Sequence, residues 1–298
     1  MIRHTASMDD VPGTEATQAR NRRSLWWALP ITLLSLALLY PIWRELGIAV
    51  FGPPEIVLRE VFAPGDAAQV FDHSSFDALL RAHVDDQGFV DYGALYDEPA
   101  QLDAYLLSLG AADFDALGLD EKLAFLLNAS NACTLRLMLD HWPVDSIREI
   151  PEQERWTARR WLLFGETLSL AELRDSWLRP CFAEPRIHFA SSDASLGGPP
   201  LRAEAYIGAR IDEQLTDQAR RALANPRWAN LVGDTGTLQL TQLLLRYGDD
   251  FAQTYDSVLA FVRANQPAVD ALAATGTRIR VAWLEYDWRH NGQTNRPN

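Results

Sequence analysis

The chain has 298 residues, of which 48% are hydrophobic and 22% charged, which is enough apolar material for one large domain or two small ones. Its formal net charge is −13, so we expect no nucleic-acid partner, because such a protein needs a basic face to neutralise phosphates. The two cysteines, Cys133 and Cys181, are too few for a disulfide framework or a zinc site. A single bridge between them stays open as an alternative outside the cytosol.

Residues 25–43 are the first segment with a clear character. The run LWWALPITLLSLALLYPIW carries no charge, and its length is close to the roughly 20 residues that span a bilayer. Because Arg20, Arg22 and Arg23 precede it, the N-terminal side is expected to be cytoplasmic. We predict a disordered cytoplasmic tail over 1–24 and a single-pass signal anchor in the inner (cytoplasmic) membrane, with the C-terminal domain facing the periplasm. A cleaved signal peptide is the alternative, but no small-x-small cleavage site follows the run.

The predicted linker over 44–70 leads into a domain expected over 71–290, followed by a polar C-terminal tail over 291–298. Apolar spacing in the first half of the domain predicts helices over 74–83, 101–109 and 119–141, the last of which Pro143 ends. Residues 88–92 are typical of a short strand or turn. Gly165 separates two halves of a predicted hairpin over 161–168, and Ser169 is expected to cap a helix that runs to Trp177.

The second half of the domain mixes helices with separated strands. A strand is predicted over Arg186–Ala190, with Ile187 and Phe189 on one side, and a long alternating strand over 278–288. Helices are predicted over 211–224, 238–247 and 255–264. Many helices with few strands indicate the α+β class. The expected architecture is a helix-rich single globular domain with a small mixed or antiparallel sheet, placed after an N-terminal transmembrane helix.

One candidate group lies on the predicted helix over 119–141. Glu121, Asn128 and Asn131 stand seven and three residues apart, so they share one helix face. Asparagines in a protein core are costly unless they are hydrogen-bonded. The group is therefore either a structural network or a device that orients a catalytic group or a substrate.

Two further candidate groups lie later in the chain. His188 precedes the polar loop Ser191–Ser195, and a histidine beside Asp193 is a candidate general base, although a lone histidine is often structural. The segment Glu285–Trp288 either borders a cleft or is an ordinary strand end. The six histidines show no paired ligand spacing, so we expect no metal and no cofactor.

These segments together resemble DUF547, a family of unknown function. The resemblance covers about residues 70–290 and rests on the order and spacing of six blocks: Gly88–Tyr92, Glu121–Asn131, Pro143–Ile147, Arg186–Ala190, Ala194–Leu201 and Tyr286–Trp288. The chain departs from the family pattern in its helix motif, where the family has Trp, Ile and Tyr at the positions of Leu126, Leu127 and Ser130. It also departs at Asp193 and Gly198, where the family pattern has cysteines.

The resemblance implies a relation to papain-like or transglutaminase-like cysteine hydrolases. Transferred residue by residue, it selects as catalytic candidates His188, Asp193, Glu121 and Asn131. Because a carboxylate is a far weaker acyl-transfer nucleophile than a thiolate, whether the chain is an enzyme stays open. We expect a membrane-anchored domain that binds a peptide or envelope protein through a degenerate site, with ligand contacts from Asn128, Ser192, Ser195, Tyr286 and Asp287. The alternatives are a hydrolase of altered chemistry using His188 and Asp193, and a structural envelope protein.

Overall fold

The computed structural model describes residues 56–62, 69–233 and 236–296. The predicted tail and the predicted anchor over 25–43 therefore lie outside the described residues. Within the described ranges, no helix combines the length and the apolar character that crossing a membrane requires. The described part of the compact unit that starts at Glu55 contains two hydrophobic cores.

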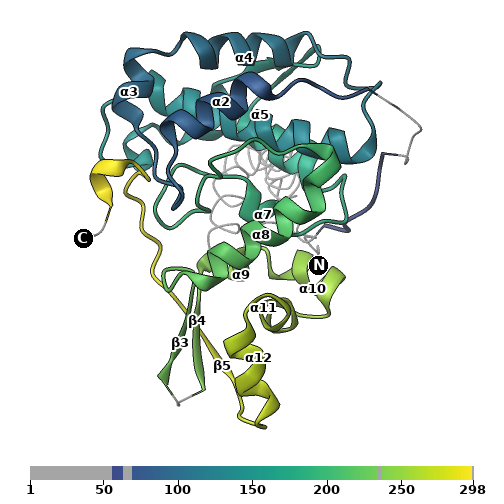
Figure 1. Ribbon diagram of the computed structural model, residues 1–298, viewed down its shortest axis with the longest axis vertical. Helices are drawn as coiled ribbons and strands as arrows, with labels where there is room; N and C mark the ends of the chain where they lie inside the picture. Colours follow the sequence, from purple (N-terminus) through teal and green to yellow (C-terminus); the bar gives the residue numbers. More distant parts are fainter. Residues whose placement is uncertain (1–55, 63–68, 234–235, 297–298) are drawn as a thin grey trace, which may run out of the picture. The chain divides into compact units, whose positions relative to one another are not determined.

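The first core is built around α5 (Leu119–Asp140), a 22-residue helix that is buried on nearly every side. α4 (Ala100–Gly110) and α3 (Tyr92–Asp97) pack against α5, and α2 (Ser74–His83) packs against α3 and α4 (Figure 1). Because other elements surround α5, its polar side chains are buried together with its apolar ones, and they must find partners inside the protein. The three helices predicted for this half are confirmed to within a residue at each end.

The predicted hairpin is also confirmed. β1 (Trp161–Leu163) pairs antiparallel with β2 (Glu166–Leu168), and Phe164 and Gly165 form the turn with φ angles of 41° and 83°. Two successive positive φ angles match the twist of a two-residue hairpin. Ser169 then caps α6 (Leu170–Glu172) through a capping box with Glu172, and the helix continues as η3 (Leu173–Leu178).

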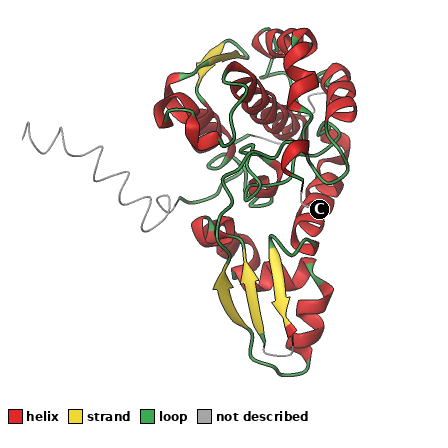
Figure 2. Ribbon diagram, turned by 90° about the vertical axis from the view of Figure 1, so that its left-hand side faces the viewer, coloured by secondary structure: helices red, strands yellow, loops and turns green. Residues whose placement is uncertain are grey.

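The second core combines a small mixed sheet with helices. β4 (Thr237–Leu240) lies between β3 (Ala229–Val232), which is antiparallel to it, and β5 (Arg280–Trp283), which is parallel to it (Figure 2). Leu238 and Leu240 of β4 are fully buried against apolar helix residues. The helices of this half are α8 (Ile211–Ala224), α9 (Gln242–Arg246), α10 (Gly248–Tyr255), α11 (Val258–Asn265) and α12 (Pro267–Ala274). The chain is therefore helix-rich with small sheets, as expected for the α+β class.

The strand predicted over 186–190 is wrong, because the structure has the one-turn helix α7 (Ile187–Ala190) there. The amide of Ser191 donates to the carbonyl of Ile187, which closes a helical turn. All four residues of α7 are buried, so the apparent alternation of apolar side chains carries no information about a strand. Ile187 and Ala190 belong to the first core and Phe189 to the second, so α7 lies at the junction of the two cores.

Three other predictions near the C-terminus differ from the structure. The helix predicted over 238–247 is a strand up to Leu240, and helix α9 begins only after the Thr241 cap. The helix predicted over 255–264 is interrupted at Asp256, whose φ of 68° ends α10 before Ser257 caps α11. The strand predicted over 278–288 is restricted to β5, and β3, α3 and α12 were not predicted. Pairing of β4 with β3 and β5 accounts for the strand at 237–240, whereas the break between α10 and α11 comes from the positive φ of Asp256 and the Ser257 cap.

Short helices complete the fold: η1 (Ile147–Glu149), η2 (Glu154–Ala158), η4 (Gly208–Arg210) and η6 (Gln293–Asn295). The amide of Val90 donates to the carbonyl of Asn291, and the Tyr92 hydroxyl donates to the Asn291 side chain at 2.7 Å. Asn291 is buried, so packed structure continues past residue 290, where the domain was expected to end.

Candidate functional site

The two asparagines of α5 form hydrogen bonds to the backbone of segments distant in sequence. Asn128 donates to the carbonyl of Tyr206 at 2.8 Å and accepts from its amide at 2.9 Å. Asn131 donates to the carbonyl of Ala190 at 3.0 Å and accepts from the amide of Ser192 at 2.9 Å. Both side chains are buried, and each uses its amide nitrogen as a donor and its oxygen as an acceptor in these bonds. Asn131 therefore fixes the loop that follows His188, whereas Asn128 fixes a different segment.

Glu121 lies in a separate buried group. Its carboxylate accepts from the amides of Gly208 at 2.9 Å and Phe71 at 3.2 Å, and it lies 3.7 Å from Nε2 of His73. Burial raises the pKa of Glu121 and lowers the pKa of His73 to about 4. Among the described residues, no hydrogen bond joins Glu121 to His188 or Asp193. The partners of Glu121 are thus a different set from those of His188 and Asp193.

His188 belongs to a buried triad with Arg179 and Asp250. Its Nε2 lies 2.7 Å from Oδ2 of Asp250, to which Arg179 donates two hydrogen bonds of 2.7 and 2.9 Å. The exposed fractions are 6% for His188, 3% for Arg179 and 0% for Asp250. The ring of Tyr247 stacks on the His188 imidazole at 3.8 Å between centroids. Sequence reasoning missed Arg179, Tyr247 and Asp250, because no local spacing connects them to His188.

The charges of the triad follow from its contacts. Burial lowers the pKa of His188, against the opposing effect of Asp250. Burial alone would raise the pKa of Asp250, but the hydrogen bonds from His188 and Arg179 outweigh it and lower that pKa. Near neutral pH the triad therefore holds a neutral histidine beside the Asp250–Arg179 ion pair, with Asp250 contacting both partners. In this state Nε2–H of His188 donates to Asp250, which fixes the orientation of the ring.

Asp193 belongs to a second group, the Asp193 group, with Ser195 and Tyr286. Its Oδ1 accepts from the amide of Ser195 at 3.0 Å and from its hydroxyl at 2.7 Å, and its Oδ2 accepts from the hydroxyl of Tyr286. The Ser195 hydroxyl also accepts from the amide of Gly198 at 2.9 Å. Burial and the nearby Asp193 charge raise the pKa of Tyr286 well above its usual value, so Tyr286 remains a donor. Both carboxylate oxygens of Asp193 are therefore engaged.

Positions 193 and 198, where the family pattern has cysteines, are neighbours in space. A Cβ atom built on Gly198 would lie 1.7 Å from Oδ1 and 2.6 Å from Cγ of Asp193. A side chain at position 198 is thus incompatible with the present position of the Asp193 carboxylate. The Cβ atoms of two cysteines placed here would be near enough for a disulfide, which needs about 3.5–4.5 Å.

The two groups are joined through the chain. Asp193 follows His188 by five residues, and Asn131 holds the carbonyl of Ala190 and the amide of Ser192 between them. Among the described residues, no hydrogen bond joins His188 directly to Asp193. The structure therefore brings these two candidates into one neighbourhood, but each has its own partners.

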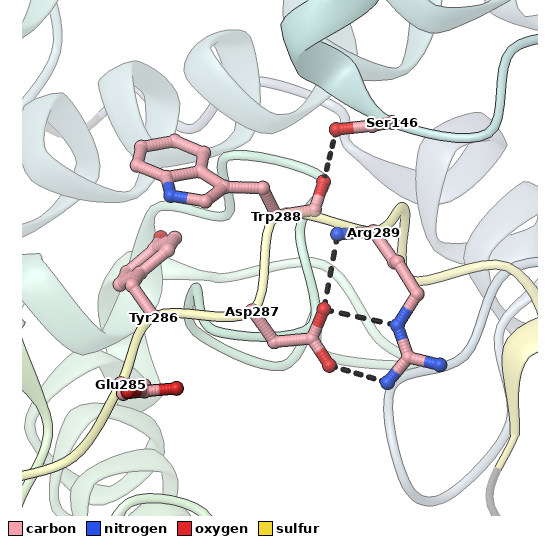
Figure 3. A pocket seen from close by; sticks show the side chains of 6 residues that line it. All are labelled: Ser146, Glu285, Tyr286, Asp287, Trp288 and Arg289. Carbon is pink, nitrogen blue, oxygen red and sulfur yellow. Dashed lines mark hydrogen bonds and ion pairs between the residues drawn. The ribbon is translucent and has the colours of Figure 1, made fainter.

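An open pocket of about 550 Å³ borders the Asp193 group (Figure 3). The rings of Tyr286 and Trp288 lie 4.4 Å apart, while Asp287 turns the other way and pairs with Arg289. The Ser146 hydroxyl donates to the carbonyl of Trp288 at 2.6 Å. Among the predicted ligand contacts, Tyr286 and Asp287 line this pocket, Ser195 reaches Tyr286 from behind, and Asn128 and Ser192 do not line it. Glu285, Trp288, Arg289 and Ser146 complete the lining.

The two thiols of the chain lie elsewhere. Cys133 and Cys181 are both free, so the bridge that the sequence left open does not form in the structure. Burial raises the pKa of each thiol, and neither is an activated thiolate. No cluster of three potential metal ligands is found in the part of the chain that the structure describes.

Comparison with known proteins gives one match. Residues 114–222 match the family model described as "Protein of unknown function, DUF547". The matched range contains the asparagine pair of α5, His188, Asp193 and Gly198. No curated protein and no solved structure matches the chain.

Proposed function

We propose that this domain, in which residues 114–222 match the model of the DUF547 family of unknown function, binds a peptide or protein segment through a site that lacks cysteine chemistry. The observation that carries the proposal is the set of hydrogen bonds made by the Asp193 carboxylate. Its two carboxylate oxygens are held by Ser195 and Tyr286, and the neighbouring position 198 has no side chain. A held carboxylate at this position closes a loop and supplies no acyl-transfer nucleophile.

An extended peptide is the ligand class that the neighbouring strand favours. β5 lies at the edge of the described sheet, and Val281 and Trp283 are each 40% exposed. The amides of Arg280 and Leu284 donate to Gly236 and Leu240 on the β4 side. The amides of Val281 and Trp283 therefore point away from β4, because successive amides of a strand alternate in direction. Such an edge accepts an added strand from a partner.

The pocket extends this edge. Residues 285–289 follow β5 directly, so a peptide paired with β5 would run toward the rings of Tyr286 and Trp288. Aromatic side chains of this kind give large contact area to a bound ligand. Asp193 and Ser195 are hydrogen-bonded to the hydroxyl of Tyr286, so they support the orientation of a ring that lines the proposed binding surface.

We also propose that the chain is anchored in the inner membrane through residues 25–43, with the domain on the periplasmic side. The uncharged run and the arginines before it support this arrangement. A reporter enzyme fused to the C-terminus tests it. The fusion should be active only when the reporter is one that works outside the cytoplasm. Activity of a cytoplasm-dependent reporter would reverse the orientation.

A second candidate function is hydrolysis of altered chemistry. The observation that favours it is the His188–Asp250 contact of 2.7 Å, because an oriented neutral histidine is the usual form of a general base. With Nε2–H directed to Asp250, Nδ1 is the ring atom that can accept a proton. Asp193, five residues further along the chain, would then act as the partner acid–base group.

One experiment separates the two candidates. The full chain, purified in detergent, is screened against peptide, amide and ester substrates beside the variants His188→Ala and Asp193→Ala. The binding proposal predicts no turnover, together with a saturable peptide that raises the melting temperature. Turnover that either variant abolishes would contradict the binding proposal and support the hydrolase.

A further inference from the structure

Residues 56–62 are docked on the domain, although they fall within the predicted linker. The Gln253 side chain holds this segment at two points, accepting from the amide of Leu58 at 3.0 Å and donating to the carbonyl of Ile56 at 2.9 Å. Further along, Glu60 accepts from the amide of Ala183 at 3.0 Å, and the amide of Val61 donates to the carbonyl of Cys181 at 3.1 Å.

An aromatic contact completes the docking. The ring of Phe62 lies 5.6 Å from that of Phe114 and 5.4 Å from that of Phe182. The ammonium of Lys122 lies 5.7 Å from the centre of the Phe62 ring. The segment is thus attached by backbone bonds, by side-chain bonds and by apolar packing, while Val57 and Val61 remain exposed at its surface.

The elements that this segment joins are the same ones that the buried triad joins. Gln253 lies on α10, one helical turn after Asp250, and Cys181 follows Arg179 by two residues. Phe182 belongs to the first core and Phe251 to the second. The Arg179–Asp250 pair is therefore an internal connection between two segments that residues 56–62 connect a second time at the surface.

We propose that residues 56–62 are a strap that holds the turn after Leu178 against α10 and keeps the buried triad closed. Release of the strap removes the surface contacts between these segments and opens the triad to solvent. The strap precedes the rest of the domain in the chain. A mechanical force from the N-terminal side, or a partner that competes for the binding of the strap, therefore acts on the strap first. The strap does not depend on whether the site binds or cuts, so it stands independently of the proposed function.

The test uses the full chain with the double variant Gln253→Ala, Glu60→Ala. The control is Arg59→Ala, which changes an exposed strap residue without a hydrogen bond to any described residue. Amide exchange of residues 56–62 reports docking, and the rate of His188 acylation by diethyl pyrocarbonate, followed by mass spectrometry, reports opening of the triad. Both readouts should rise roughly tenfold in the double variant, since two or three hydrogen bonds are lost, and stay unchanged in the control.

Three results would overturn the strap. Faster exchange of residues 56–62 with unchanged His188 acylation would show that docking and the triad are not coupled. Unprotected amides in the unmodified chain, or protection that survives the double variant, would show that the contacts named here do not hold the segment. Because both substituted side chains lie at the surface, a thermal unfolding curve is expected to confirm that the variant is folded.

Discussion

The buried triad and the Asp193 group are close in the chain, but their charged groups are stabilised in different ways. The triad encloses an anion and a cation away from water, so each charge depends on the other. The Asp193 group places its carboxylate against two hydroxyls beside an open pocket. The comparison teaches that neither candidate residue is free in the structure. His188 is tied to Asp250, and the position expected to carry the nucleophile closes a loop.

The largest effect is expected in the triad. Arg179→Ala leaves the fully buried Asp250 without its cation, and breaking a buried pair from one side costs about 3–5 kcal/mol of unfolding free energy. The control is Arg263→Ala, whose partner Asp270 is exposed and whose loss should cost about 0–1 kcal/mol. Urea unfolding measures both. Equal losses in the two variants would remove the distinction between the triad and a surface pair.

Acid should weaken the buried triad through His188. Burial lowers the pKa of His188 in the folded chain. Below about pH 6.5 His188 of the unfolded chain therefore binds a proton that His188 of the folded chain does not bind. Unfolding free energy therefore falls with pH from about 6.5 down to the lowered pKa, by about 1.4 kcal/mol per pKa unit of lowering. Asp250, whose pKa is also lowered, adds a loss only at lower pH, as the carboxylate itself protonates.

Unfolding curves at pH 7, 6 and 5 measure this loss. In His188→Gln the decline should be shallower, though not absent, because burial also lowers the pKa of His73, to about 4, and that of His290. A slope that His188→Gln leaves unchanged would mean that His188 titrates normally in the folded chain.

The contacts of the two groups also show what the sequence could predict. Local periodicity was sufficient for α5 and α8, and composition was sufficient for the α+β class. Local periodicity failed at α7. Because all of Ile187–Ala190 is buried, no exposed polar face distinguishes a helix from a strand there. The candidates His188 and Asp193 were found because they lie close together in the sequence, whereas Asp250 lies 62 residues from His188 and no local pattern marks it. Tertiary contacts of this separation are set by packing.

A smaller effect on stability is expected when two cysteines are introduced into and beside the Asp193 group. Asp193→Cys with Gly198→Cys should form a disulfide under oxidising conditions, because the two positions are adjacent. A loop this short gives roughly 2 kcal/mol of stabilisation over the reduced form. Mass spectrometry and paired unfolding curves test both statements, with Asp193→Ser and Gly198→Ser together as the control. A double-cysteine variant that stays reduced would contradict the adjacency.

The smallest effect is expected from Tyr286→Phe. It removes the hydroxyl that donates to Asp193, but Ser195 still binds the carboxylate, so the loss in unfolding free energy should be about 1 kcal/mol. Tyr96→Phe, at an exposed position, is the control and should have no measurable effect. A loss for Tyr286→Phe as large as that for Arg179→Ala would show that the Asp193 group behaves like the buried triad.

The most direct test of the central claim measures binding and turnover in the same samples of the full chain. Val281→Pro removes an amide that points away from β4, while Val281→Ala removes the side chain and keeps the amide. An extended peptide selected for binding should remain intact, lose about tenfold or more in affinity to Val281→Pro, and lose little to Val281→Ala. Cleavage of that peptide, stopped by His188→Ala, would contradict the account.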